Sequence, residues 1–509
     1  MTLRPASRLI IPLLACATLL AGCSEKRSRN VQVSVIGTPE QLAKPLANDT
    51  TAAGKLMLEA TAQGLVGFDA QGDILPGLAQ RWIVQDNGRS YIFRVRRAKW
   101  PDGQKVDADG VVSILKSRIR ANIQRDPMGA LSAISAVNSM TSEVIEIDLG
   151  APRPNLLQLL AQPQMGIISR DGGTGPYRAV RQKHFWILTP IPDPAADPQS
   201  EDGTEEEDAI EPWQVRILRA ERAAKAIVRY RMGYADLVLG GRFTDVPLLA
   251  RADLNKRDVR VDPVDGLFGL AFTGKGKFFE DPKIRQALNM AIDRDRLPTA
   301  FALGGWAVRT TILNQQLDLP GAPTQPDWAG MTMDDRRAQA QASISIWRAD
   351  HDGQMPVVRI SMPAGTGAKL LFNLISSDFN RIGVQAQLAK DPKDADLVLI
   401  DEVAPYDSAA WYLSRIDCAR GISCDRAAEE QLRQAAQASS VEERDARLGD
   451  AEALFVAHGG FIPLAAPVRW SLVSSQLNGF STSPRARHPL NQLDRKSTRL
   501  NSSHTDISR

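Results

Sequence analysis

The sequence predicts an α/β fold that is divided into two or three domains. About 470 residues remain between Cys23 and Leu493, whereas a single hydrophobic core stops growing at roughly 250–300 residues. Within this length, a strand pattern at Val357–Ser361 is followed by a helix with an apolar stripe over Leu370–Ile375 and a second strand at Val384–Leu388. A β-α-β order of this kind is typical of a parallel sheet with helical crossovers.

The N-terminal half contains further strands and a helix with clear boundaries. Val31–Ile36 alternates apolar and polar residues, and Ser90–Arg96 places Tyr91, Phe93 and Val95 on one face. Turn sequences at residues 86–88 and 100–103 enclose this second strand. Asp107 is a good N-cap for a helix whose buried stripe is Val111, Leu115 and Ile119.

The C-terminal half shows the same kind of boundaries. Asp281-Pro282 predicts a helix start, and Ile284, Leu288 and Ile292 form the buried face. Ser440 and Glu443 form a capping box for a helix that ends at Gly459-Gly460. Two strands are then expected, at Phe461–Leu464 and Trp470–Val473.

The first residues predict export from the cytoplasm. Arg4 and Arg8 precede an apolar run, Leu9–Ala21, that is too short to span a bilayer comfortably and suits a secretory signal. The run ends in Leu20-Ala21-Gly22-Cys23, which resembles the lipobox of bacterial lipoproteins. The resemblance implies removal of residues 1–22, acylation of Cys23, and anchoring to the cell membrane or the outer membrane. The alternative is a plain signal peptide followed by an unmodified cysteine.

The last residues, 494–509, resemble the in-frame translation of a sequencing-library adapter, and we expect them to lie outside the natural fold. Residues 1–22 carry a net charge of +2, and residues 494–509 carry another +2. The formal net charge of +3 for the whole chain therefore becomes −1 for residues 23–493. This balance gives no basic surface for nucleic acid.

Cys418 and Cys424 are the two cysteines left after Cys16 departs with the signal and Cys23 is acylated. In an oxidising compartment their proximity predicts a disulfide that closes a small loop. Free buried thiols are one alternative. A metal-binding pair is another, although no histidine lies nearby in the sequence.

Several blocks together resemble solute-binding protein family 5, the dipeptide-, oligopeptide- and nickel-binding subunits of ABC importers. The longest block covers residues 56–118 and includes Glu59–Leu65, Asp69–Ala79 and Trp100–Gly103. Four shorter blocks follow in the order of the family: Gly173–Tyr177, Gly233–Val238, Leu270–Phe272 with Ile284–Arg294, and Phe461–Leu464 with Asn478–Phe480.

The resemblance implies two α/β lobes that are joined by a hinge, with an extra lobe inserted near the N-terminus. Mapped onto this chain, the first lobe comprises residues 23–50, 161–264 and 466–493. The inserted lobe is 51–160, and the second lobe is 265–465. A peptide or peptide-like solute would bind between the lobes of a monomer and pass to an inner-membrane permease and its ATPase.

The chain departs from the family where its peptide binders present an acidic residue to the terminal amine of the peptide. The corresponding stretch is Ala404-Pro405-Tyr406-Asp407, in which proline replaces that acid and Asp407 is the substitute. We expect Tyr406, Asp407, Trp411 and Trp306 to bind the ligand, with Tyr412 and Trp470 as further candidates. For each aromatic residue the alternative is packing in the core.

The sequence lacks the motifs of hydrolytic enzymes and of nucleotide-binding proteins. The sequence contains neither GxSxG nor HExxH, and Gly274-Lys275-Gly276-Lys277 lacks the spacing of a phosphate-binding loop. We therefore expect no catalysis, no cofactor, no bound metal and no nucleic-acid partner. The remaining alternative is an envelope scaffold lipoprotein that keeps the fold without transporting a solute.

Overall fold

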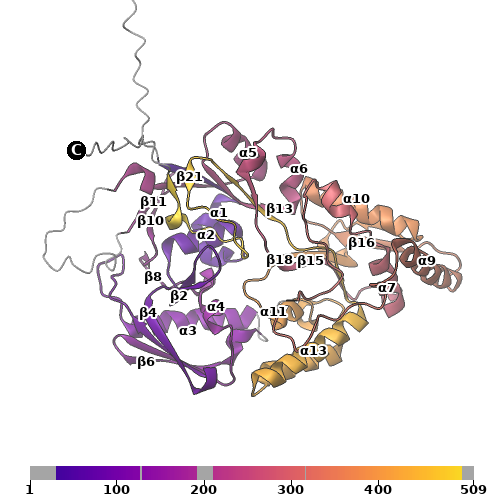
Figure 1. The fold of residues 1–509 in the computed structure, drawn as a ribbon, viewed down its shortest axis with the longest axis horizontal. Helices are drawn as coiled ribbons and strands as arrows, with labels where there is room; N and C mark the ends of the chain where they lie inside the picture. The colour runs from indigo at the N-terminus through magenta and orange to yellow at the C-terminus, as the bar shows by residue number, and fades with distance from the viewer. Residues whose placement is uncertain (1–29, 126–128, 192–209, 316, 496–509) are drawn as a thin grey trace, which may run out of the picture.

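A computed structural model describes residues 30–125, 129–191, 210–315 and 317–495. Three larger sheets, of seven, five and four strands, organise these residues, and three further sheets have two strands each (Figure 1). The signal sequence, Cys23, most of the tail after Asp494 and much of the acidic stretch between Pro192 and Pro212 lie outside the described residues.

The first-lobe sheet has seven strands, in the order β10-β11-β12-β1-β13-β20-β14. At its centre β1 (Val31–Ile36) runs parallel to β12 (Arg216–Glu221) and β13 (Leu237–Arg242), and β20 (Arg469–Val473) runs antiparallel to β13. The outer strands are β10 (Tyr177–Arg181), β11 (Trp186–Pro190) and β14 (Val259–Val261). Because β1 is central, both of its faces are covered and even Ser34 is buried.

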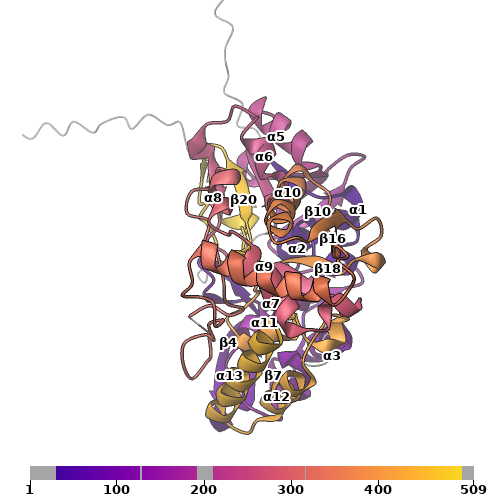
Figure 2. The same ribbon diagram turned by 90° about the vertical axis from the view of Figure 1, so that its right-hand side faces the viewer.

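The second-lobe sheet has five strands, in the order β17-β16-β18-β15-β19. The predicted β-α-β unit is confirmed: β16 (Val357–Ser361) and β17 (Gln385–Leu388) are parallel and are joined by α10 (Thr366–Arg381). The other strands are β15 (Gly266–Phe272), β18 (Leu397–Val403) and β19 (Phe461–Pro463). Figure 2 shows α9 (Met333–Ala349) crossing in front of this lobe.

The inserted sheet is an antiparallel sheet of four strands in the order β4-β5-β7-β6. Its members are β4 (Ala79–Gln85), β5 (Ser90–Val95), β7 (Val144–Leu149) and β6 (Ile134–Thr141). The helix predicted after Asp107 is α3 (Ala108–Arg125), and the Asp107 carboxylate accepts a hydrogen bond from the Gly110 amide at 2.8 Å. As predicted, the Val111, Leu115 and Ile119 side chains are buried against the sheet.

Local capping explains where several of the other helices begin and end. The Asp281 side chain caps α7 (Pro282–Ala291), and the Ser440 side chain caps α13 (Val441–His458), which ends at Gly459 in the left-handed region. The remaining elements are α1 (Pro39–Ala43), α2 (Ala52–Thr61), α4 (Leu156–Leu160), α5 (Ala223–Arg231), α6 (Val246–Leu249), α8 (Arg296–Ala300), α11 (Ala409–Ser414), α12 (Arg426–Gln437), β2 (Val66–Phe68), β3 (Ile74–Pro76), β8 (Ile168–Ser169), β9 (Gly172–Gly173), β21 (Leu477–Asn478) and β22 (Asp494–Arg495).

The hydrophobic cores run across the junctions between the sheets. One cluster joins residues of the inserted sheet, such as Phe93, to Trp411 and Tyr412, and a second joins Val238 of β13 to Phe268 of β15. The lobes therefore lie in contact in this arrangement. Short segments on either side of the junction, residues 262–265 and 464–468, connect β14 to β15 and β19 to β20.

The packing of α2 differs from the expected division of the chain at residue 51. Its buried side chains Leu56, Met57 and Ala60 lie in the same cluster as Val33 of β1. The apolar face of α2 thus covers the first-lobe sheet, and we propose that the inserted lobe begins after Thr61. The other lobe boundaries remain as proposed from the sequence.

Candidate functional site

Charged side chains gather at the junction between the first-lobe and second-lobe sheets. Asp401, on β18, has a side chain that is only 2% exposed and accepts hydrogen bonds from two arginines of the other sheet. Arg242 Nη2, at the end of β13, lies 2.7 Å from Asp401 Oδ2, and Arg469 Nη1, at the start of β20, lies 2.8 Å from Oδ1. One carboxylate therefore ties the two lobes together beside the connecting segments.

A C-terminal strap, residues 479–490, runs along the same junction. Arg485 donates to the Asp407 carboxylate at 2.5 Å and to the Ala404 carbonyl at 3.2 Å. Arg487 pairs with Glu59 of α2. His488 Nε2 lies 3.2 Å from the carboxylate of Asp262, in the first connecting segment. The strap thus supplies basic groups to carboxylates from several parts of the chain.

A small cavity opens beside this cluster, at the start of β15. Asp265 and Arg309, which pair at 2.8 Å, lie on its wall together with Tyr412 and Asn314. Burial raises the pKa of the Tyr412 hydroxyl, and Asp265 and Asp407 act in the same direction. The cavity measures about 10 Å³, which is space for roughly one water molecule.

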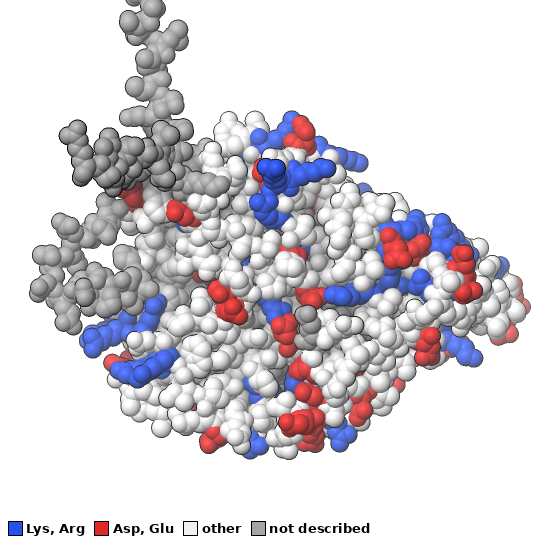
Figure 3. Space-filling view, in the orientation of Figure 1, with Lys and Arg blue, Asp and Glu red and all other residues white. Residues whose placement is uncertain are grey.

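Figure 3 shows basic and acidic side chains interleaved across the middle of one face of the molecule, in the orientation of Figure 1. A larger hollow lies elsewhere, on the outer surface of the inserted sheet, where Arg81, Trp82 and Glu143 are among its walls. That hollow is formed by β4, β5 and residues 141–144 and does not include residues of the junction.

The ligand-binding residues expected from the sequence occupy two different environments. Tyr406, Trp411 and Trp306 are buried, with exposed fractions of 6%, 3% and 8%. Trp306 packs against Phe301 and donates its ring N–H to the Ala466 carbonyl at 2.7 Å. Their contribution to ligand binding remains a prediction, and this packing agrees with the alternative of a role in the core.

Asp407 is the exposed member of the set, and its carboxylate already has a cationic partner in Arg485. The neighbouring backbone is held as well: Gln162 donates to the Pro405 carbonyl at 2.9 Å and Asn155 to the Asp407 carbonyl at 3.0 Å. These hydrogen bonds hold the backbone around Pro405 so that the Asp407 side chain faces the strap.

Trp470, another aromatic candidate, lies on β20 and is buried in the core, and its ring N–H donates to the Arg242 carbonyl of β13 at 3.0 Å.

Sequence reasoning missed Arg242, Arg469, Arg485 and Arg487, and it considered Asp401 and Glu402 only as groups that support the site or lie on the surface. None of them stands in a motif, and Arg242 is separated from its partner Asp401 by 159 residues. An indirect signal was present for Arg469, because a strand was expected at Trp470–Val473, close to the expected lobe boundary at residue 466. Only the folded arrangement shows which charged residues meet there.

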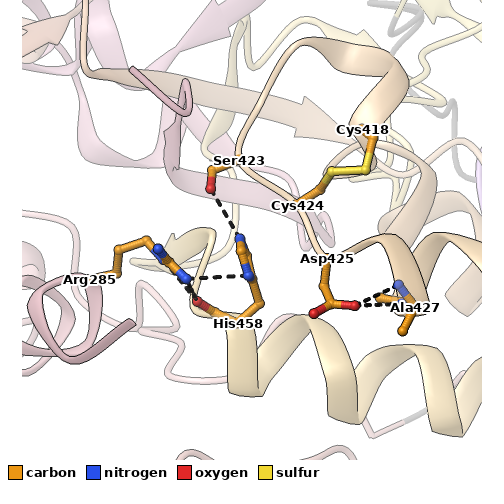
Figure 4. Close-up of a disulfide and its surroundings, with 8 residues drawn as sticks. Arg285, Cys418, Ser423, Cys424, Asp425, Ala427 and His458 are labelled. Carbon is orange, nitrogen blue, oxygen red and sulfur yellow. Dashed lines mark hydrogen bonds between the residues drawn. A yellow bond between two sulfur atoms is a disulfide. The ribbon is translucent and has the colours of Figure 1, made fainter. Parts of the chain in front are cut away.

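Cys418 and Cys424 are joined by a disulfide, with their Cα atoms 5.3 Å apart (Figure 4). Beside it, Ser423 Oγ lies 3.0 Å from His458 Nε2, a contact that at first resembles a nucleophile and its base. Arg285 Nη2 lies 3.3 Å from His458 Nδ1. Because a guanidinium only donates, Nδ1 accepts this hydrogen bond and Nε2 carries the proton that is donated to Ser423.

His458 therefore cannot remove the proton of Ser423 in this arrangement. Burial lowers the pKa of His458, and the charge of Arg285 lowers it further, so the neutral form is favoured. The pair stabilises the C-terminal end of α13 and activates no nucleophile. Within the described residues, no group of three or more histidine, cysteine, aspartate or glutamate side chains is arranged to hold a metal ion.

Comparisons with known proteins place this architecture in context. The model of the bacterial extracellular solute-binding proteins, family 5 (middle part), matches residues 73–415. A probable di/tripeptide-binding protein 5 of Pseudomonas aeruginosa (strain UCBPP-PA14) is 23% identical over 491 residues, which cover 84% of this chain and 89% of that protein.

Solved structures show the same fold. The structure of OppA from Burkholderia pseudomallei superposes with a TM-score of 0.74 at 17% identity, covering 92% of this chain and 99% of the other. Haemophilus influenzae OppA in complex with RPPGFSPFR gives a TM-score of 0.73 at 15% identity, with the same two coverages. The predicted α/β fold with two lobes is thereby confirmed.

Proposed function

Because this chain belongs to family 5 of the bacterial extracellular solute-binding proteins, we propose that it binds a peptide or peptide-like solute between its lobes and delivers it to an ABC importer. The observation that carries the proposal is the junction itself, where Arg242 and Arg469 of one lobe hold Asp401 of the other. The P. aeruginosa relative is named a di/tripeptide-binding protein, which supports a short peptide as the solute. That relative offers no support for an envelope scaffold.

The proposed binding step is closure of the lobes about the two connecting segments. The cavity of about 10 Å³ beside Asp265 has no room for a peptide, and this supports a binding step in which the solute enters while the lobes are further apart. Contacts made by the solute to both lobes then stabilise the closed arrangement, because a ligand shifts the equilibrium toward the state that it binds more tightly. The closed complex is the form that a permease and its ATPase would receive.

Ligand binding can be measured by thermal unfolding of residues 24–493 in the presence of dipeptides to pentapeptides and their N-acetylated forms. A solute at 100 times its dissociation constant is expected to stabilise the protein by about 2.7 kcal/mol, which raises the unfolding midpoint measurably. A cooperatively unfolding sample whose midpoint responds to no peptide or N-acetylated peptide would contradict the proposal.

We propose in addition that the protein is a monomeric lipoprotein held at the membrane through Cys23. The proposed attachment rests on the sequence Leu20–Cys23. Among the described residues, no helix is long and apolar enough to cross a bilayer. Cells fed a labelled fatty acid are expected to incorporate the label into the wild type and not into Cys23→Ala. Equal labelling of the two proteins would remove the anchor from the proposal.

A further inference from the structure

The hollow on the outer face of the inserted sheet has the size of a small-molecule site. It measures about 370 Å³, and sites for small molecules occupy roughly 300–1,000 Å³. Helix α3 packs against the opposite face of the sheet, where Phe93 of β5 is fully buried, and successive side chains of a strand alternate between the two faces. The hollow therefore lies on the face that α3 leaves uncovered.

Two rows of side chains cross the strands that line the hollow. One row places Arg81 of β4 directly opposite Arg94 of β5, and the next row places Ile83 opposite Ile92. Residues opposite one another on neighbouring antiparallel strands project from the same face of the sheet, and Ile83 is 56% exposed. The hollow thus has a cationic row and an apolar row side by side.

The charged residues that line the hollow leave one positive charge to be balanced. Arg81 and Arg94 are basic, and Glu143 is the acidic residue on the wall. Glu143 lies 3.4 Å from Arg94 and is half-exposed, so it offsets one guanidinium. Glu146 lies further along β7, accepts a hydrogen bond from the Ser90 hydroxyl at 3.1 Å and does not line the hollow. Two like charges directly opposite each other on a sheet are unfavourable by themselves, and an anion would relieve this repulsion.

The position of Arg94 distinguishes this arrangement from the protection of an edge strand. β4 is an edge strand, and a charged residue such as Arg81 on an edge commonly prevents pairing with another chain. Arg94 lies on β5, which is paired on both sides, so edge protection does not account for it. Two adjacent guanidinium groups can instead bind the two oxygens of one carboxylate through charge-assisted hydrogen bonds.

We infer that the hollow binds a monocarboxylate with an apolar tail. The carboxylate lies between Arg81 and Arg94, where it balances the remaining positive charge, and the tail lies on Ile83 and Ile92. Removal of the tail and of the exposed Ile83 side chain from water favours binding. None of these residues belongs to the lobe junction, so the inference is independent of the proposed peptide function.

Sodium octanoate is the probe for this site, and two analogues test its two rows. Octanamide keeps the tail without the charge, and butyrate keeps the charge with a short tail. An NMR titration of residues 24–493, observed on the ligand, is expected to show saturable binding of octanoate. Octanamide is expected to bind about tenfold more weakly because it lacks the charge-assisted hydrogen bonds, and butyrate about tenfold or more because it buries less apolar surface.

Substitutions in the cationic row are expected to change octanoate affinity in both directions. Arg81→Gln and Arg94→Gln are each expected to lower it about tenfold and to leave octanamide binding unchanged. Glu143→Gln is expected to raise it severalfold, because this change releases Arg94 from its carboxylate partner. Arg178→Gln is the matched control, since Arg178 is also an exposed arginine on an edge strand, β10 of the first-lobe sheet. Its octanoate affinity is expected to equal that of the wild type.

A folded wild type that shows no saturable binding of octanoate would overturn the inference, and so would equal octanoate affinities of the wild type, Arg81→Gln and Arg94→Gln. Octanoate that binds equally to these three proteins and is displaced by a peptide would lie in the lobe junction, which would also overturn the hollow as its site. Peptide binding in the thermal screen is expected to be the same for Arg81→Gln and the wild type. Failure of the octanoate titration therefore leaves the proposed function in place.

Discussion

Asp401→Asn is expected to lower the free energy of unfolding by about 3 kcal/mol and to weaken solute binding. The buried Asp401 carboxylate accepts hydrogen bonds from Arg242 and Arg469, which belong to the opposite lobe. An asparagine of the same shape removes the negative charge and offers one acceptor in place of two. The two arginines then lose the buried carboxylate that both of them bind, which disfavours the closed arrangement.

Chemical denaturation gives the stability, and titration calorimetry with a solute identified in the thermal screen gives the affinity. Glu143→Gln is the matched control, because the Arg94–Glu143 pair at 3.4 Å is half-exposed and such surface pairs contribute about 0.5 kcal/mol or less. If Asp401→Asn changes stability no more than Glu143→Gln does, Asp401 does not tie the lobes together.

Gly241→Ala is expected to cost about 3 kcal/mol, because the new methyl group has no space. A Cβ atom at position 241 would lie 2.1 Å from two ring carbons of Trp470. Trp470 is buried, and its ring N–H donates to the Arg242 carbonyl. The ring cannot withdraw without breaking that hydrogen bond and disturbing the β13–β20 pairing that positions Arg242 and Arg469.

Gly67→Ala provides the comparison, since Gly67 also lies in a strand and a Cβ there meets nothing within 4 Å. Its unfolding midpoint in urea is expected to match the wild type. A Gly241→Ala protein that unfolds at the same urea concentration would show that the β13–β20 region adapts to the extra methyl group, and that Trp470 does not constrain Arg242.

Local patterns in the sequence predicted the elements well, because each element depends on residues that are close in the chain. Asp107 and Ser440 cap the helices that were expected to follow them. The period of the apolar residues likewise predicted the buried face of α3 and the β16-α10-β17 unit. Alternation was less informative for β1, where Ser34 is buried and donates to Glu221 at 2.6 Å, because a central parallel strand is covered on both faces.

The ion pairs at the junction between the lobes could not be predicted from local sequence patterns. An ion pair depends on distance in space, and Asp401 lies 159 residues from Arg242 and 68 from Arg469, while Arg485 lies 78 residues from Asp407. Whether the side chain of Trp306 or Trp411 contacts a solute or packs in the core also depends on which part of the folded chain lies against it. Helix caps, the β-α-β unit and the family resemblance could thus be obtained from the chain alone, whereas the pairing of these carboxylates with arginines arises only when two sheets and the C-terminal strap meet.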